Sequence, residues 1–112
     1  MITIYHNPRC SKSRECLALP QLQQLPVNIV KYLDTPLSKD EIKSLIKKLG
    51  IKPEQLVRHK EAAWEPYKDK KLTPSQIIAA LAKHPQLIER PIVVNGDRAI
   101  IARPAELALT IF

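Results

Sequence analysis

One cysteine near the start of the chain stands among several cationic side chains. Cys10 lies in the segment His6-Asn7-Pro8-Arg9-Cys10-Ser11-Lys12-Ser13-Arg14, between a predicted strand over residues 2–5 and a predicted helix over about 10–19. Free backbone N–H groups and the helix dipole favour an anion at the start of a helix. A cysteine there commonly has its pKa lowered to about 3.5–7.5, and neighbouring cations act in the same direction. The segment therefore predicts a thiolate nucleophile at Cys10, with a buried structural thiol as the alternative.

The spacing around Cys10 excludes several other kinds of site. Position 13 is Ser, so there is no C-x-x-C pair and no resolving thiol, and the C-x5-R loop of phosphatases would need Arg where Cys16 stands. Six helical residues rise about 9 Å, beyond the roughly 7 Å limit for a disulfide, so we expect Cys16 in the core. The histidines are scattered relative to the thiols, and we predict no metal site. With only two glycines, the chain has no phosphate-cradling loop.

Three arginines further along the chain stand next to predicted element boundaries. Arg58 follows a short predicted helix, Arg90 directly precedes Pro91 and a predicted strand, and Arg103 directly precedes Pro104 and the last predicted helix. A single arginine of this kind is more often an ordinary surface residue. Guanidinium groups nevertheless suit tetrahedral oxyanions, because they donate in a planar fork and stay charged. A thiolate repels an incoming oxyanion, so an oxyanion site beside Cys10 would need several such cations.

The order of predicted elements indicates an α/β fold. In chain order they are a strand over 2–5, a helix over 10–19, a strand over 29–33, a helix over 38–49, a short helix over 53–57, a helix over 73–83, strands over 92–94 and 98–101, and a last helix from about 104 that carries Leu107, Leu109 and Ile111. Asn95-Gly96 favours a type I′ hairpin turn, and the helix joining the first two strands makes them parallel. This order predicts a thioredoxin-like fold, with a mixed four-stranded sheet flanked by helices and a helical insertion over about 53–84, between strands 2 and 3.

Length and composition limit the class of protein. The chain has 112 residues, 45% of them hydrophobic, and a net charge of +7, which predicts one globular domain over residues 1–112. No apolar run approaches the roughly 18 residues of a membrane span, and the first residues lack the pattern of a signal peptide, so we expect a cytoplasmic protein that binds no membrane. The charge suits either a nucleic-acid surface or a small anion. Aromatic residues make up only 4% of the chain, which disfavours a base-stacking surface, and we expect no nucleic-acid partner.

The sequence resembles the glutaredoxin-coupled arsenate reductases of the thioredoxin-fold class, also called ArsC-like, over essentially its whole length. The resemblance rests on residues 2–10 with Ser13-Arg14, on residues 56–58, on residues 90–94, and on Arg103-Pro104 with Glu106. It implies reduction of arsenate to arsenite, with no bound cofactor, glutathione as co-substrate and glutaredoxin as partner. We expect the protein to act as a monomer.

The resemblance also assigns roles to individual residues. It implies that Cys10 attacks arsenate and that His6 lies by the thiol and tunes it. It implies that Arg58, Arg90 and Arg103 hold the oxyanion and the arsenylated intermediate. In this family the proline that matches Pro91 is a cis-proline, which would bring Arg90 toward Cys10.

Two other functions remain open from the sequence. Spx-type transcriptional regulators resemble this family and bind RNA polymerase, but they commonly sense redox state through a C-x-x-C pair, which Ser13 removes here. A monothiol glutathione-dependent oxidoreductase would use Cys10 without any role for arsenic. A pull-down that recovers RNA polymerase would support the regulator. Activity on a glutathionylated peptide with none on arsenate would support the monothiol oxidoreductase.

Overall fold

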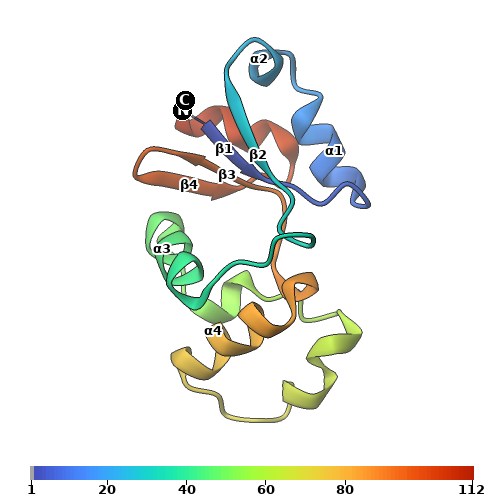
Figure 1. Cartoon of the computed structure of the whole chain (residues 1–112), viewed down its shortest axis with the longest axis vertical. Helices are drawn as coiled ribbons and strands as arrows, with labels where there is room; N and C mark the ends of the chain where they lie inside the picture. Colours follow the sequence, from blue (N-terminus) through green and yellow to red (C-terminus); the bar gives the residue numbers. More distant parts are fainter. Residues whose placement is uncertain (1) are drawn as a thin grey trace. The chain divides into compact units, whose positions relative to one another are not determined.

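The chain forms two compact units in the computed structural model, which describes residues 2–112 (Figure 1). The first unit consists of the residues up to 35 together with residues 90–112, and it contains the sheet. The second unit consists of residues 36–89 and contains helices and one isolated antiparallel bridge between Val57 and Ile88. None of the helices within residues 2–112 is long and apolar enough to cross a membrane.

The first unit is built on a mixed four-stranded sheet, as predicted. Its strands are β1 (Ile2–Tyr5), β2 (Val27–Val30), β3 (Ile92–Asn95) and β4 (Arg98–Ile101), in the order β2-β1-β3-β4. β1 pairs with β2 in parallel, and the other two pairs are antiparallel. The central strands β1 and β3 are therefore hydrogen-bonded along both edges.

The second strand begins and ends earlier than the sequence predicts. It pairs with β1 from Ile2↔Val27 to Tyr5↔Val30, whereas the prediction was 29–33. The last bond of this ladder runs from the N–H of His6 to the carbonyl of Val30 at 2.9 Å, and the chain leaves the sheet after it. The length of its partner strand thus limits β2, and the residues up to Leu33 that the prediction included lie in a turn.

The hairpin between β3 and β4 is present, but its turn is not the predicted one. Asn95 pairs with Arg98, so the two loop residues are Gly96 and Asp97. Gly96 has a φ of 63°, and no non-glycine residue in the described chain has a positive φ. A type I′ turn requires positive φ at both loop residues, so the type I′ prediction is wrong, and a positive φ at the first position alone is the type II′ pattern.

Helices cover one face of this sheet. They are α1 (Ser11–Leu17), α2 (Pro20–Gln23) and the 3-10 helix η4 (Ala105–Ile111), which contacts α1, β3 and β4. Pro20 is the first residue of α2, a position where its missing N–H costs nothing. The predicted helix over 10–19 is α1, which ends before Pro20 as expected, and α2 is a further short helix that the sequence did not predict. The buried core of the unit consists of Ile2, Ile4, Cys16, Leu22, Val93, Ala102, Ala105, Ala108 and Ile111.

The last predicted helix is present as η4, and its 3-10 geometry decides which of its residues are buried. A 3-10 helix has three residues per turn, so the residues at every third position share a face. In η4 these are Ala105, Ala108 and Ile111, which are buried. Leu107, which the predicted helix also carries, is 36% exposed and does not belong to this core.

The second unit contains two helices that the sequence predicted from their caps. They are α3 (Lys39–Leu49), capped by Ser38, and α4 (Pro74–Lys83), capped by Thr73, and both have complete capping boxes. Because α3 and α4 pack against each other, the helical insertion begins at residue 36 and not near 53. The unit also contains three 3-10 helices, η1 (Pro53–Leu56), η2 (Ala62–Tyr67) and η3 (Pro85–Leu87).

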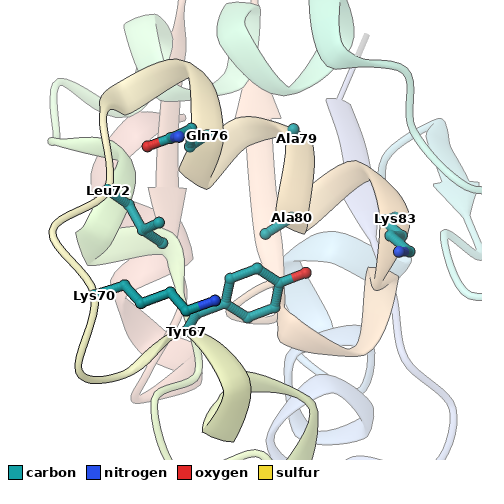
Figure 2. Close-up of a pocket in the computed structure, with 7 residues that line it drawn as sticks. All are labelled: Tyr67, Lys70, Leu72, Gln76, Ala79, Ala80 and Lys83. Carbon is teal, nitrogen blue, oxygen red and sulfur yellow. The ribbon is translucent and has the colours of Figure 1, made fainter.

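The second unit also has an open pocket of about 350 Å³ that the sequence analysis did not foresee (Figure 2). Its walls come from α4 and from the segment between η2 and α4, and they include two lysines, Lys70 and Lys83, beside the ring of Tyr67. Its lining contains no thiol, histidine, carboxylate or arginine. The pocket therefore lacks the groups on which the predicted chemistry depends.

Candidate active site

The thiol of Cys10 lies at the start of α1, as predicted. Cys10 is the N-cap residue of this helix, with an extended backbone at φ −97°. The preceding loop is held by Asn7, whose carbonyl accepts the N–H of Cys10 at 3.0 Å and whose side-chain oxygen accepts the N–H of Arg9 at 3.0 Å. A local Asn-Pro turn therefore positions the thiol at the end of the helix where backbone N–H groups have no helical partners.

The surroundings of Cys10 favour its thiolate. Burial raises the pKa of the Cys10 thiol, but hydrogen bonds from the backbone N–H groups of Ser13 and Lys12, together with the charge and the N–H of Arg90, lower it. The net pKa of Cys10 lies below its ordinary value. Charge-assisted hydrogen bonds to a sulfur anion thus outweigh its desolvation.

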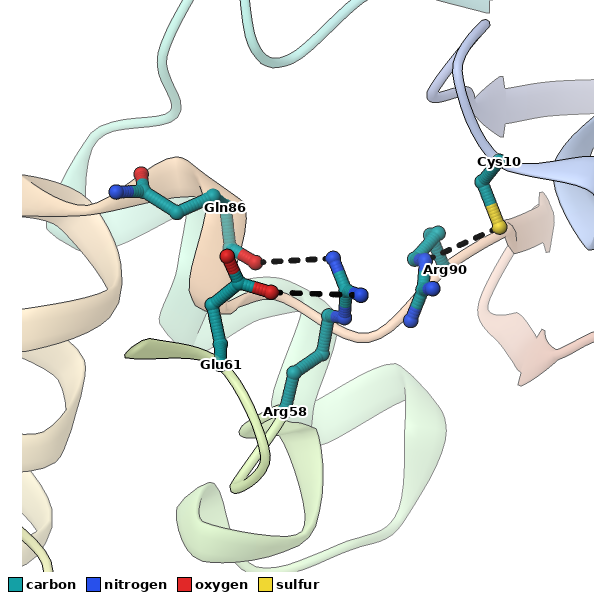
Figure 3. A network of polar contacts seen from close by, with 5 residues as sticks. All are labelled: Cys10, Arg58, Glu61, Gln86 and Arg90. Carbon is teal, nitrogen blue, oxygen red and sulfur yellow. Dashed lines mark hydrogen bonds and ion pairs between the residues drawn. The ribbon is translucent and has the colours of Figure 1, made fainter. Parts of the chain in front are cut away.

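The guanidinium of Arg90 contacts the thiol directly. Its Nε donates a hydrogen bond to Cys10 Sγ at 3.2 Å, as Figure 3 shows. The peptide bond between Arg90 and Pro91 is cis, which confirms the expectation drawn from the resemblance. The residue that follows Pro91 is the first of β3 and pairs with Tyr5 at the end of β1. The adjacent ends of two paired strands therefore lead to the thiol and to the guanidinium.

His6 lies in the same unit, and its ring contacts the side chain of Ser13. Its Nδ1 lies 2.6 Å from the hydroxyl oxygen of Ser13, and the N–H of Asn7 donates to the same oxygen at 3.0 Å. The pKa of His6 lies below its ordinary value because of burial and the positive charges of Lys31 and Arg14. The structure therefore places His6 behind the Cys10 loop, in contact with the helix that carries the thiol.

The cationic residues around Cys10 make different contacts. The Nη1 of Arg14 donates to the carbonyl of Pro8 at 2.8 Å, which joins the first turn of α1 to the loop before Cys10. The side chain of Arg9 is exposed, and only its backbone N–H takes part in the turn. Lys12 forms an exposed ion pair with Glu15 at 3.8 Å. Arg14 thus braces the loop, whereas Lys12 acts on the thiol through its backbone.

The other two predicted arginines are placed differently. Arg103 belongs to the first unit, is exposed, and precedes Pro104 through a second cis peptide bond. Arg58 belongs to the second unit. Its Nη2 lies 3.4 Å from the carboxylate of Glu61, and its Nη1 donates to the carbonyl of Gln86 at 3.4 Å (Figure 3). Cys10, His6 and Arg90 are thus brought into one neighbourhood of the first unit, and Arg58 has local partners of its own.

Two residues of this neighbourhood were missed as site residues by the sequence analysis. Asn7 and Ser13 are both buried and form the hydrogen bonds that hold the loop and the helix start. An Asn-Pro pair is a recognisable turn signal, so Asn7 was detectable. The resemblance includes Ser13 and not Ser11, but only the folded chain shows that the hydroxyl of Ser13 is buried and that of Ser11 is exposed.

The second cysteine has the properties of a core residue, as predicted. Cys16 is completely buried, and burial raises the pKa of its thiol to about 11. Both cysteines are free thiols. Within residues 2–112, no group of three or more His, Cys, Asp and Glu side chains converges in a way that could hold a metal ion.

Comparisons with known proteins agree with this geometry. The sequence matches the ArsC family over residues 5–111. A protein of Haemophilus influenzae called arsenate reductase is 42% identical, over 98% of this chain and 97% of that protein. An Escherichia coli protein called uncharacterized protein YfgD is 41% identical, over 98% of this chain and 95% of that protein. A solved structure of arsenate reductase from Vibrio cholerae superposes with a TM-score of 0.93 at 43% identity, covering 99% of this chain and 97% of that chain.

These matches extend over both units of the chain. The superposition confirms the thioredoxin-like fold class predicted from the order of elements. The family match includes the segments of Cys10, Arg58, Arg90 and Arg103. This chain therefore belongs to the ArsC family.

Proposed function

We propose that this protein is an arsenate reductase that uses the Cys10 thiolate as its nucleophile. The observation that carries this proposal is the contact of 3.2 Å between Arg90 Nε and Cys10 Sγ at the start of α1. It combines a thiol of lowered pKa with a group that binds oxyanions well. The relatives called arsenate reductase support the choice of substrate.

The proposed reaction transfers two electrons from two thiols to arsenic. The Cys10 sulfur forms a bond to As(V), and one arsenate oxygen leaves as water. Glutathione then forms a second sulfur–arsenic bond, and a second oxygen leaves as water. A glutaredoxin thiolate attacks the glutathione sulfur, and the electron pair of the broken sulfur–arsenic bond reduces arsenic to As(III). Water finally displaces Cys10 from arsenic, which releases arsenite and restores the thiolate.

The site residues have distinct roles in this proposal. Arg90, Arg103 and Arg58 neutralise the charge on the arsenic-bound oxygens, which otherwise opposes attack by an anion. For Arg90 the support is its contact with the thiol, and for Arg58 and Arg103 it is the family resemblance. His6, which contacts Ser13 in α1, adjusts the pKa of the Cys10 thiol.

The proposed partners follow from the chemistry of the single active thiol. Position 13 carries a buried hydroxyl, so an external thiol must complete the reduction, and we propose glutathione and glutaredoxin. We propose that the protein works as a monomer in the cytoplasm, with no bound cofactor and no metal. We also propose that both units form one functional domain over residues 1–112, since the family match spans residues 5–111.

The decisive experiment is a coupled assay of the purified protein. Arsenate-dependent oxidation of NADPH is followed in the presence of glutathione, glutaredoxin and glutathione reductase. We expect activity in the wild type and in Cys16→Ala, and only the background rate in Cys10→Ser. An identical rate in wild type and Cys10→Ser contradicts the proposal.

The same assay separates arsenate reduction from monothiol oxidoreductase activity. Cys10 is a single activated thiol, which also suits attack on a glutathionylated substrate. With a glutathionylated peptide in place of arsenate, activity that depends on Cys10 together with no activity on arsenate supports the oxidoreductase function.

A further inference from the structure

A buried polar cluster lies behind the Cys10 loop. It consists of His6, Asn7 and Ser13, which are 6%, 7% and 0% exposed. His6 and Asn7 come from the loop after β1, and Ser13 comes from the first turn of α1. Buried polar groups of this kind are almost always hydrogen-bonded, so the donors and acceptors of the cluster can be assigned.

The hydroxyl of Ser13 determines where the proton of His6 lies. Its oxygen accepts the N–H of Asn7 at 3.0 Å. Its hydrogen needs an acceptor, and the nitrogen within reach is Nδ1 of His6 at 2.6 Å. Nδ1 is then an acceptor without a hydrogen, and the neutral imidazole carries its proton on Nε2.

We propose that Ser13 is a positioning residue for the nucleophile: its hydroxyl links neutral His6 to the backbone of Asn7 and thereby aims the N–H groups of Lys12 and Ser13 at Cys10. In this arrangement His6 contributes a hydrogen-bond acceptor and no positive charge. Its influence on the thiol passes through Ser13.

Three effects oppose the protonation of His6. Burial is the largest, and the positive charges of Lys31, after β2, and Arg14, in α1, act in the same direction. An imidazolium would also carry a hydrogen on Nδ1, directed at a hydroxyl oxygen that already accepts the Asn7 N–H. The buried Ser13 hydrogen would then lose its acceptor, which costs free energy. Burial, the two positive charges and the hydrogen bond with Ser13 therefore all favour a neutral His6.

The link from Ser13 to the thiol is short. The backbone N–H groups of Ser13 and Lys12 both lower the pKa of the Cys10 thiol. The Ser13 side chain ties the same residue to Asn7, whose carbonyl accepts the N–H of Cys10. Loss of this hydroxyl removes the hydrogen bond between Ser13 and Asn7. The start of α1 is then free to shift relative to the loop, and the N–H groups of Ser13 and Lys12 interact less favourably with the Cys10 sulfur.

The tautomer of His6 is measured on the unmodified protein. The ring nitrogens of the wild type are assigned by ¹H–¹⁵N correlation spectroscopy between pH 5 and 8. We expect an unprotonated Nδ1, a protonated Nε2 and a titration below the ordinary pKa of histidine. A proton on Nδ1 in the neutral ring overturns the proposal, and this measurement needs no variant to fold.

The effect on the thiol is measured with Ser13→Ala, in a Cys16→Ala background that leaves one thiol. The rate of alkylation by iodoacetamide is followed against pH. We expect the Cys10 pKa to rise by about one unit, which lowers the thiolate fraction below that pKa about tenfold. We also expect the His6 pKa to rise, because without the Ser13 hydroxyl the protonation of Nδ1 no longer leaves a buried hydroxyl hydrogen without an acceptor.

Two further variants separate positioning from general loosening of the fold. Ser11→Ala removes the exposed hydroxyl of the neighbouring serine in α1 and should leave both pKa values unchanged. Ser13→Thr keeps the hydroxyl and should retain most of the lowered Cys10 pKa. An unchanged Cys10 pKa in Ser13→Ala overturns the proposal. These readouts need no arsenate, so they are independent of the proposed function.

Discussion

Arg90 and Cys10 are 80 positions apart in the sequence, and yet Nε of the arginine donates to the sulfur at 3.2 Å. The contact depends on the pairing of β1 with β3, in which Tyr5 lies opposite Ile92. The loop after β1 leads to the thiol, and the cis Arg90–Pro91 bond leads into β3. The pairing of β1 with β3 at the centre of the sheet thus brings the Arg90 guanidinium to the Cys10 thiol.

Substitution of Arg90 should weaken both the thiolate and the binding of oxyanions. In Arg90→Gln the positive charge is lost, and we expect the Cys10 pKa to rise by about one unit, as seen in the pH profile of alkylation. In Arg90→Lys the charge remains but the planar fork is lost, so sulfate should protect Cys10 from alkylation less well than in the wild type. Unchanged protection by sulfate in Arg90→Lys would remove Arg90 from the oxyanion site.

The two thiols should differ strongly in reactivity. Cys16 is completely buried and its pKa is about 11, whereas the Cys10 pKa lies below the ordinary value. At pH 7 we expect iodoacetamide to modify Cys10 alone in the native protein and both cysteines in denaturant. Mass spectrometry of the native reaction counts the adducts. Modification of Cys16 at a rate near that of Cys10 would contradict the structure.

His6 should make the protein less stable as the pH falls. Its pKa is lowered in the folded chain, so below about pH 6.5 the unfolded chain binds a proton that the folded chain does not. The free energy of unfolding should therefore fall from pH 7 toward pH 5 in urea titrations. We expect His6→Gln to flatten this decline, while His59→Gln, which replaces an exposed histidine, keeps it. An equal decline in His6→Gln would show that other groups cause it.

The cap of α3 should contribute measurably to stability. The hydroxyl of Ser38 accepts the N–H of Glu41 at 3.1 Å, and the Glu41 carboxylate accepts the N–H of Ser38 at 3.0 Å. We expect Ser38→Ala to lower the free energy of unfolding by about 1 kcal/mol. The matched control is Ser44→Ala, an exposed position within α3, which should be neutral or slightly stabilising. Urea denaturation measures both variants.

The ion pair of Arg58 should compete with an oxyanion if Arg58 binds one. Its Nη2 lies 3.4 Å from Glu61 in a partly exposed pair, an interaction worth at most about 1 kcal/mol. Glu61→Gln releases the guanidinium, so the KM for arsenate should fall, by at most about fivefold. Arg58→Ala should raise the KM in the same assay. A KM that changes in neither variant would remove Arg58 from the proposed site.

The sequence by itself determined the features that depend on neighbouring residues. The capping boxes at Ser38 and Thr73 and the thiol at the start of α1 were predicted because they rest on hydrogen bonds within a few positions. The last helix was predicted without its buried face, because its 3-10 geometry and its packing on β3 and β4 are not local properties.

Tertiary structure decided which residues meet. The limits of β2 follow from the length of β1, and the contact of Arg90 with Cys10 follows from the pairing of β1 with β3. Ser13 and Ser11 look alike in the sequence, but packing buries only Ser13, against His6 and Asn7. The reason is physical: a cap needs only the next turn of chain, whereas burial and long-range contacts depend on every element packed around a residue.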